Sequence, residues 1–384
     1  MAFIRSRVQS FAPGDEIFRK YLDERIQADP EVIDLLVAFP HLLPPPHIQE
    51  AFKRAADEGF FHYGSTKGYL PLRQSVSKYL EEKKGIKGDP EREIIITSGA
   101  SGALFTAIWA FVDQGDEVIL PDPTFQMITN NVVMAGGIPV SIPLSRDFQL
   151  PVEQIARAVT SRTRMICLVN PDNPTGTVYS RQCLLEIARV ACEKDLLVLT
   201  DEVHDRFVYE GEHTSIATLP GMENRTILVN SFSKTYGMGG LRVGYAAMPS
   251  ELMELFFRIH SNDNPHPCMA SQVAAVAALE GPQDFLEEWR KEFRARRDLC
   301  AEALNQIEGI DCVRPQSGIV VFPDVSNRGT SEEVTRMLID RAHVATHPGS
   351  RYGKNGEGHL RICFASVPFP RLQEALERIK EAFA

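Results

Sequence analysis

The sequence predicts an α/β fold built around a parallel sheet, and two patterns carry that prediction. Short runs that are apolar at nearly every position, such as residues 94–97 and 165–169, alternate with longer segments of helical periodicity. Strands that are apolar along their whole length are buried on both faces, as in parallel sheets covered by helices. Ligands bind such sheets at the carboxyl ends of the strands, so the residues after each run are candidates for chemistry.

The elements follow one another regularly through the middle of the chain. The expected strands are residues 94–97, 117–120, 165–169, 196–200 and 226–230. The expected helices between them are residues 101–112, 125–135 and 181–194. The proline-rich segment from Pro40 to Pro46 has neither pattern, and we interpret it as a linker between an N-terminal arm and the large domain.

From about Pro282 onward the pattern changes to that of a smaller α+β domain. A long charged amphipathic helix runs to about Glu308, and the elements expected after it are strands 319–322 and 360–364 and helices 332–342 and 371–384. We therefore expect three parts along the chain. They are an N-terminal arm with part of the small domain (1–45), a large domain (46–281) and a C-terminal small domain (282–384).

The composition is that of an ordinary soluble globular protein. The chain has 384 residues, of which 43% are hydrophobic and 24% charged, and its net charge of −10 argues against a nucleic-acid surface. No apolar run has the length of a membrane span, and residues 1–7 do not resemble a secretory signal. The seven cysteines include no CxxC pair, which favours buried thiols in a reducing cytoplasm. The ten histidines have no ligand spacing, so we expect no metal.

Lys234 lies in the most informative segment, Ser231-Phe232-Ser233-Lys234-Thr235, directly after the apolar run 226–230. Lysine can condense with an aldehyde to form a Schiff base. The hydroxyl groups beside it, and Arg242 eight positions later, suit a phosphate dianion. The glycines that follow would let the backbone approach a ligand, which a solvated surface lysine does not need. An aldehyde that carries a phosphate is pyridoxal phosphate (PLP).

This segment resembles the lysine signature of the fold-type I, class I and II PLP-dependent aminotransferases, and the resemblance covers roughly residues 31–384. It implies a mostly parallel, seven-stranded sheet in a large PLP-binding domain, with a smaller α+β domain beside it. It also implies that Lys234 forms the Schiff base, and that Ser231, Ser233 and Arg242 bind the phosphate.

Two segments that follow strands match other cofactor contacts of the family. Asp201 ends the run 196–200, where the resemblance implies a carboxylate paired with the protonated pyridine nitrogen, which keeps the ring an electron sink. The alternative is an ordinary helix N-cap. Asn170-Pro171-Asp172-Asn173-Pro174-Thr175-Gly176 resembles the family's NPxNPTG loop. Asn173 would then donate to the ring phenolate and contribute to the substrate site.

The small-residue turn 97–104 precedes a helix, and a helix N-terminus attracts phosphate. The resemblance implies phosphate contacts from Gly99, Ala100 and Ser101. Phe125 matches the aromatic residue that stacks on the cofactor ring, although an aromatic residue there suits a core equally well.

Two further positions match the family pattern. Tyr63, in a segment that starts at His62, matches the tyrosine that reaches the phosphate of a neighbouring subunit, which implies a homodimer with shared sites. We count it with Lys234 and Asp201 among the expected catalytic residues. Arg361 matches the arginine that holds the substrate carboxylate, for which a bidentate guanidinium is well suited; a strand-edge salt bridge is the alternative.

Two positions depart from the family pattern. His204 stands where most of these enzymes have a tyrosine, and an imidazole is expected to titrate near neutrality. Ala38, expected to line the substrate site, replaces a usual glycine. Both features resemble the cystathionine-lyase-like branch of PLP enzymes.

The reading we favour is an aminotransferase that moves an amino group between an L-amino acid and a 2-oxo acid, with Lys234 carrying the α-proton. A β-eliminating C–S lyase, or an oxidase or other specialised PLP enzyme, is the alternative. A transcription regulator with this fold would need a DNA-binding domain, for which only about thirty residues are available here. A second arginine for a dicarboxylate is not clearly placed, and its candidates are Arg258, Arg314 and Arg351.

Overall fold

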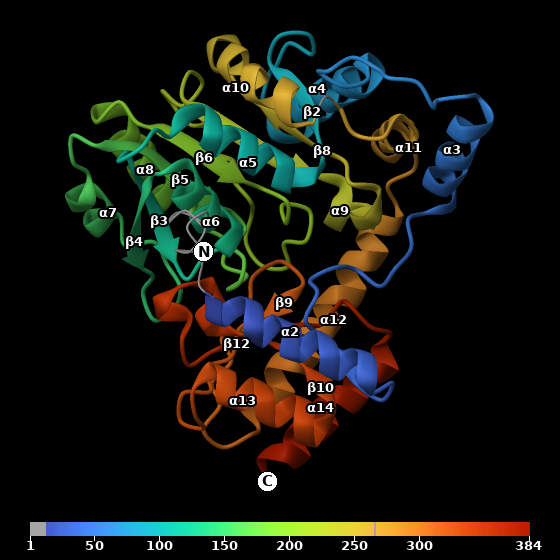
Figure 1. Cartoon of the computed structure of the whole chain (residues 1–384), viewed down its shortest axis with the longest axis vertical. Coiled ribbons are helices and arrows are strands. Elements are labelled where there is room, and N and C mark those ends of the chain that lie inside the picture. Colours follow the sequence, from blue (N-terminus) through green and yellow to red (C-terminus); the bar gives the residue numbers. More distant parts are fainter. Residues whose placement is uncertain (1–12, 265) are drawn as a thin grey trace, which may run out of the picture.

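A computed structural model describes residues 13–264 and 266–384 of the chain, so the N-terminal residues considered for a secretory signal lie outside it. Figure 1 shows a sheet with its helices in the upper part and a smaller group of helices and short strands below. The long helix α12 (Phe285–Asn305) runs from one part into the other. In the described part of the chain, no helix is long and apolar enough to cross a membrane.

The central sheet has seven strands and is mostly parallel, which confirms the predicted fold class. In spatial order the strands are β2 (Ile94–Thr97), β8 (Gly244–Ala247), β7 (Thr226–Ser231), β6 (Leu197–Asp201), β5 (Thr163–Val169), β3 (Glu117–Asp122) and β4 (Ile138–Pro143). Only β8 runs against its neighbours. The five predicted strands are present, whereas β4 and β8 had no apolar signal: β4 is largely exposed and β8 consists mainly of small residues.

Helices cover both faces of the sheet, because successive strand residues point to opposite sides. Met165, Cys167 and Val169 pack toward α5 and α6, while Ile166 and Leu168 pack toward α8. The helices of this part are α3 (Pro46–Asp57), α4 (Leu70–Lys84), α5 (Gly99–Phe111), α6 (Gln126–Ala135), α7 (Val152–Ala158), α8 (Arg181–Glu193), α9 (Phe232–Thr235), α10 (Ser250–Asp263) and α11 (Met269–Glu280). Short 3-10 turns lie at Ile216–Thr218 and Gly239–Leu241.

Among the described residues, the lower part is built from short strands and four helices. Strands β11 (His347–Pro348), β12 (Leu360–Cys363) and β9 (Val320–Val321) form one antiparallel sheet, and β1 (Ile33–Asp34) pairs with β10 (Val344–Ala345). Its helices are α2 (Pro13–Ala28), α12, α13 (Ser331–Met337) and α14 (Phe369–Phe383), with a π-helical turn at Leu338–Ala342 and 3-10 turns at Gly349–Tyr352 and Lys354–Gly356.

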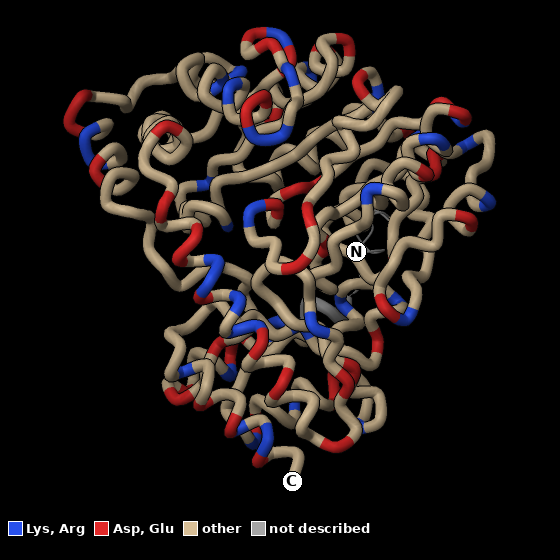
Figure 2. Tube along the Cα trace, turned by 180° about the vertical axis from the view of Figure 1, so that it is seen from behind, with Lys and Arg blue, Asp and Glu red and all other residues tan. Residues whose placement is uncertain are grey.

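The packing supports the domain boundaries that we propose at residues 45 and 281. Ile33 and Leu35 belong to the same hydrophobic core as residues of α12, β12 and α14, so the N-terminal arm completes the small domain. From Leu35 to Pro45 the chain has no helix or strand, which includes the predicted linker from Pro40 onward except Pro46, the first residue of α3. Charges of both signs are interspersed over the trace in Figure 2.

Candidate active site

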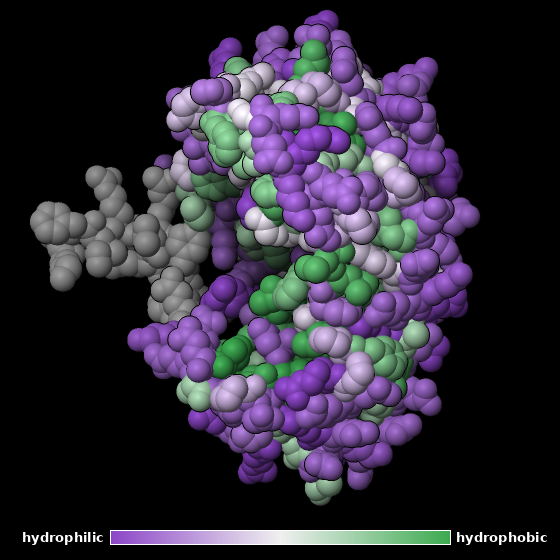
Figure 3. Space-filling model, turned by 90° about the vertical axis from the view of Figure 1, so that its right-hand side faces the viewer, coloured by the Kyte–Doolittle hydropathy of each residue, from purple (hydrophilic) through white to green (hydrophobic). Residues whose placement is uncertain are grey.

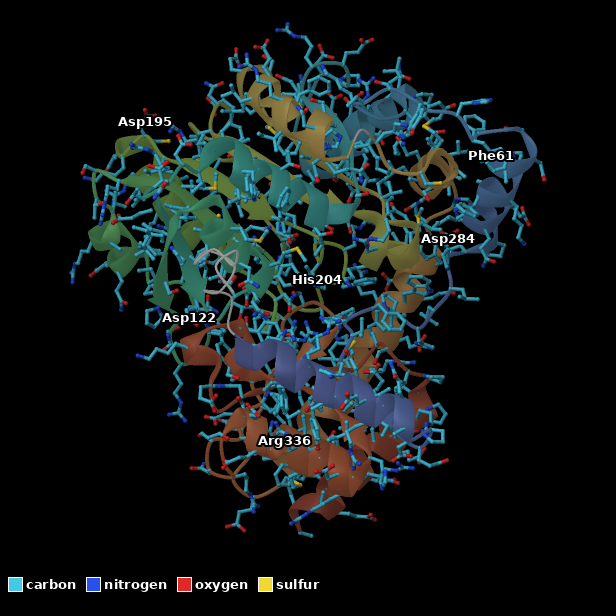
Figure 4. The ribbon with its side chains drawn as sticks, viewed as in Figure 1. Phe61, Asp122, Asp195, His204, Asp284 and Arg336 are labelled. Carbon is cyan, nitrogen blue, oxygen red and sulfur yellow. The ribbon has the colours of Figure 1, made fainter. Side chains whose placement is uncertain are left out.

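The ends of neighbouring strands bring the predicted residues to one edge of the sheet. Asp201 is the last residue of β6 and pairs in register with Val229 of β7. Ser231 ends β7, and Gly244 of β8 lies in register between Ser231 and Thr97 of β2. The loops after β6, β7 and β2 therefore start side by side. In Figure 4, His204, from the loop after β6, lies at the centre of the molecule, between its upper and lower parts.

Lys234 lies in α9, directly after β7, and its side chain is half-buried. Its ammonium group donates a hydrogen bond to the backbone carbonyl of Ala38, which comes from the N-terminal linker. Burial lowers the pKa of Lys234 to about 8, and the positive charges of Arg361 and Arg242 act in the same direction. A lysine with such a pKa is partly neutral near pH 7–8, which a nucleophile or general base requires.

Asp201 is a buried carboxyl group, 2% exposed, without an ion pair in the described part of the chain. The backbone N–H of Val203 donates a hydrogen bond to its Oδ1 at 3.1 Å. Burial raises the pKa of Asp201 to about 7, and only Lys234 counteracts this with its charge. A buried acid of this kind can bind a cation that enters the site, and a protonated pyridine nitrogen fits.

A second group of predicted residues surrounds the N-terminus of α5. The guanidinium of Arg242 donates to Ser101 Oγ at 2.9 Å and to the carbonyl of Ser98 at 3.5 Å. The buried Ser231 hydroxyl accepts from the backbone N–H of Ser233 at 3.1 Å. The first turn of a helix has free N–H groups, so α5, a guanidinium and two serines together suit a phosphate.

Glycines at two positions make this arrangement possible. A Cβ atom on Gly99, whose φ is +69°, would lie 2.8 Å from Arg242 Nη2. A Cβ atom on Gly244 would lie 2.6 Å from the carbonyl carbon of Gly99 and 2.8 Å from the backbone nitrogen of Ala100. The absence of side chains thus lets α5 begin against β8 with Arg242 beside it.

Arg361 lies in β12 and is buried, 6% exposed, yet it pairs with no described carboxylate. It donates through Nη2 to the carbonyl of Leu36 at 2.6 Å and through Nη1 to Asn173 Oδ1 at 3.5 Å. Its buried Nε has no hydrogen-bond partner, and its guanidinium lies over the ring of Tyr352 at 5.0 Å. The group therefore has capacity for an incoming carboxylate.

Phe125 directly precedes α6 and is half-buried. It packs against the core between the sheet and α5, and it also lines a cavity of about 560 Å³ together with Tyr352 and Arg361. Both interpretations of this residue, core and ring contact, are thus compatible with its position.

The comparisons with known proteins agree with this geometry. Residues 30–379 match the family of class I and II aminotransferases. The chain is 38% identical over 357 residues to an aspartate aminotransferase of Pyrococcus abyssi, an alignment that covers 91% of each protein. It is 36% identical to aromatic-amino-acid aminotransferase 2 of Thermococcus litoralis over 91% of each. The structure of Thermus thermophilus aspartate aminotransferase with maleate has a TM-score of 0.92, at 32% identity over 100% of both chains.

The chain belongs to the class I and II aminotransferases. It is therefore an enzyme that transfers amino groups, as predicted, and the regulator hypothesis is not supported. Members of this family depend on PLP and act on amino acids and 2-oxo acids.

His204 differs from the expectation of an imidazole that titrates near neutrality. The side chain is 2% exposed, and burial lowers its pKa to about 3, assisted by the positive charges of Lys234 and Arg361. Its buried Nδ1 has no hydrogen-bond partner. In this aminotransferase the imidazole is thus neutral over the physiological pH range, because its surroundings disfavour a further positive charge.

Tyr63 is the predicted residue that the single chain does not bring to the site. It is 92% exposed, in the loop before α4, and its ring packs edge-on against His266 at 5.8 Å. Lys234 and Arg361 also donate to the backbone carbonyls of Ala38 and Leu36; Ala38 was expected at the substrate site, whereas sequence reasoning missed Leu36, because a carbonyl contact leaves no side-chain pattern.

Among the candidates for a second arginine, only Arg351 lines the cavity that Arg361 and Phe125 share. Arg258 lies near Lys67 and Phe257 instead, and Arg314 lies 3.7 Å from Asp298 on the surface.

Proposed function

We propose that this aminotransferase binds PLP between Lys234, Asp201 and the N-terminus of α5, and uses it to move an amino group between an L-amino acid and a 2-oxo acid. The buried carboxyl group of Asp201, which experiences the charge of Lys234 but forms no ion pair in the described part of the chain, is the observation that carries the proposal. A buried acid without a partner is costly, and a cationic ring nitrogen would offset that cost.

When bound, PLP supplies an aldehyde for the amino group and a ring that accepts electrons. Arg361 would bind the substrate carboxylate, with Asn173 beside it and Ala38 close to Lys234. Lys234, whose lowered pKa leaves it partly neutral, would remove the proton from the substrate α-carbon and deliver one to the cofactor carbon that carried the aldehyde. Gly99, Ala100, Ser101, Ser231, Ser233 and Arg242 would hold the phosphate, and Phe125 would contact the ring.

His204 would contribute a neutral hydrogen bond to the cofactor, since its imidazole remains uncharged. Its partnerless Nδ1 shows that the ring retains hydrogen-bonding capacity within the buried site. This supports a role in holding the cofactor rather than a role as an acid.

A homodimer is part of the proposal. Large apolar or aromatic side chains are exposed in the linker and in the loop before α4: Val37, Phe39, Leu43, Phe61 and Tyr63. Phe61 lies at the right-hand edge of Figure 4, and in Figure 3, which faces this side, apolar residues gather across the middle. A second copy covering this side would bury these groups, and Tyr63 could reach its partner's phosphate site. We expect the dimer in the cytoplasm.

The test is the absorbance spectrum of the protein saturated with PLP, recorded with a panel of amino acids and no 2-oxo acid. Loss of the visible band with one equivalent of 2-oxo acid per site would support transamination and identify the donor. Continuing release of ammonia with a persistent band would indicate elimination instead, or oxidation if oxygen is consumed. A protein that binds no PLP would refute the proposal.

A further inference from the structure

The turn that follows β6 has two sides, and only one faces the site. Asp201 and His204, three residues apart, both experience the charge of Lys234. Glu202 and Asp205 have the same spacing, and although their charges also act on Asp201, their carboxylates pair with Lys84, on the other side of the turn. Residues three apart share one side of a helical turn, and the N–H of Asp205 donates to the carbonyl of Glu202 at 3.2 Å.

Lys84, the last residue of α4, joins the two carboxylates on that far side. Its Nζ lies 2.6 Å from Glu202 Oε2 and 2.5 Å from Asp205 Oδ2. The three side chains are almost completely buried, with exposed fractions of 6%, 0% and 3%. Although burial disfavours its charge, Asp205 and Glu202 raise the pKa of Lys84, which therefore remains protonated.

The neutral groups around the two carboxylates add hydrogen bonds but little charge. Ser215 Oγ donates to Glu202 Oε1 at 2.6 Å, and Asn230 Nδ2 donates to Asp205 Oδ2 at 3.2 Å. In residues 13–264 and 266–384, Lys84 is the only lysine or arginine that forms an ion pair with either carboxylate. His213 Nε2 is farther from Glu202, at 3.7 Å.

Removal of the ammonium group would thus leave two buried carboxylates without their paired lysine, and only the weaker charge interactions of His213 and Arg206 with Asp205 would remain among those that lower its pKa. A broken buried ion pair is strongly destabilising because the remaining charge is desolvated. Protonation of one carboxylate, or a movement of the turn that lets water reach Glu202 and Asp205, would relieve this cost. The same movement would displace Asp201 and His204, which share the turn.

We propose that Lys84 is a positioning residue of this aminotransferase: it neutralises the far side of the β6 turn and thereby fixes Asp201 and His204 toward PLP. The inference rests on the proposed function, since it assumes that Asp201 and His204 contact the cofactor. It assigns a role in cofactor binding to a residue that lies outside the cofactor site.

The experiment compares three variants by absorbance titration of the apoprotein with PLP and by urea unfolding without PLP. Lys84→Met removes the charge at similar length, and Lys83→Met changes the neighbouring exposed lysine of the same helix as a matched control. We expect Lys84→Met to weaken PLP binding by about tenfold, as for lost outer partners of other bound groups, and to lower the unfolding midpoint. Lys83→Met should behave as wild type in both measurements.

The rescue variant combines Lys84→Met with Glu202→Gln and Asp205→Asn, which removes all three charges at nearly constant volume. It should regain most of the lost PLP affinity and stability, since neutral replacement of a buried ion pair is often tolerated. If the triple variant binds PLP as weakly as Lys84→Met, the charge-compensation argument is wrong. Lys84→Met with the PLP affinity of Lys83→Met would also overturn it.

A substitute variant and a measurement without PLP cover the cases in which Lys84→Met does not fold or the protein binds no PLP. If Lys84→Met does not fold, Lys84→Gln takes its place, because its amide can still donate to one carboxylate, and the same comparison applies. If even the wild-type protein binds no PLP, the proposed function fails. The urea unfolding of the apoproteins then still decides whether Lys84 compensates Glu202 and Asp205.

Discussion

Replacement of Gly244 by alanine tests whether close packing at the sheet edge forms the phosphate site. Gly244 starts β8 between Thr97 and Ser231, and its backbone does not require a left-handed conformation. An added Cβ would lie 2.6 Å from the Gly99 carbonyl carbon and 2.8 Å from both the Ala100 nitrogen and the Asn230 oxygen. Because backbone atoms stand on all these sides, no side chain can rotate away to accommodate it.

The expected magnitude follows from these distances. Carbon atoms in contact prefer separations of about 3.5–4.0 Å, so α5 and β8 must separate by roughly 1 Å. Overpacking of this kind costs about 1–3 kcal/mol of unfolding free energy. The N–H groups of the first turn of α5 would move with Gly99, and one weakened hydrogen bond to a charged group is worth about 1.5–3 kcal/mol. We therefore expect Gly244→Ala to bind PLP roughly 10- to 100-fold more weakly.

The assay is titration of the apoprotein with PLP, together with urea unfolding. Gly240→Ala is the matched control, because Gly240 lies in the 3-10 turn just before β8, has no left-handed φ and has no atom within 4 Å of an added Cβ. Equal PLP affinity and equal stability of the two variants would refute the packing argument. A loss of stability with unchanged PLP affinity would mean that the phosphate binds elsewhere.

Substitutions at three other positions test the proposed roles of Lys234, Arg361 and Asp201. Lys234→Ala should abolish turnover and the visible absorbance of bound PLP, and a wild-type spectrum would contradict its assignment. Arg361→Ala should raise KM for amino acids by the equivalent of about 1.5–3 kcal/mol, with a smaller effect for Arg361→Lys; an unchanged KM would place the carboxylate elsewhere. Without PLP, the free energy of unfolding of wild type, compared with that of Asp201→Asn, should fall as the pH rises toward 7. The reason is that Asp201 has a pKa of about 7 in the folded protein, whereas in the unfolded chain its pKa is about 3.9. Urea unfolding at several pH values measures this difference, and a constant value would show that Asp201 ionises normally.

The sequence by itself determined the sheet's interior and the order of the site along the chain. Strands such as β5 and β7 are buried on both faces, so their apolar character is visible without knowledge of their neighbours. Asp201 and Lys234 follow such strands directly, and chain connectivity alone then places them at the carboxyl edge. The match to the class I and II aminotransferases confirms the family expected from these segments.

The tertiary structure decided which groups meet and which charges they carry. Arg361 contacts Leu36 and Asn173, which are 325 and 188 positions away in the chain, and no local pattern encodes such pairs. The antiparallel direction of β8 depends on its partners β2 and β7, so its short run of small residues did not predict this strand. The exposure of Tyr63 likewise depends on what covers it and not on its neighbours in the chain.

The ionisation of the site residues shows the physical reason most clearly. The sequence identified Asp201, His204 and Lys234, but their ordinary pKa values are those of solvated side chains. Burial raises the pKa of Asp201 to about 7 and lowers those of His204 and Lys234 to about 3 and 8. Desolvation and charge–charge interactions depend on the whole three-dimensional environment. The sequence therefore indicated which residues belong to the site, whereas the fold determines their protonation states.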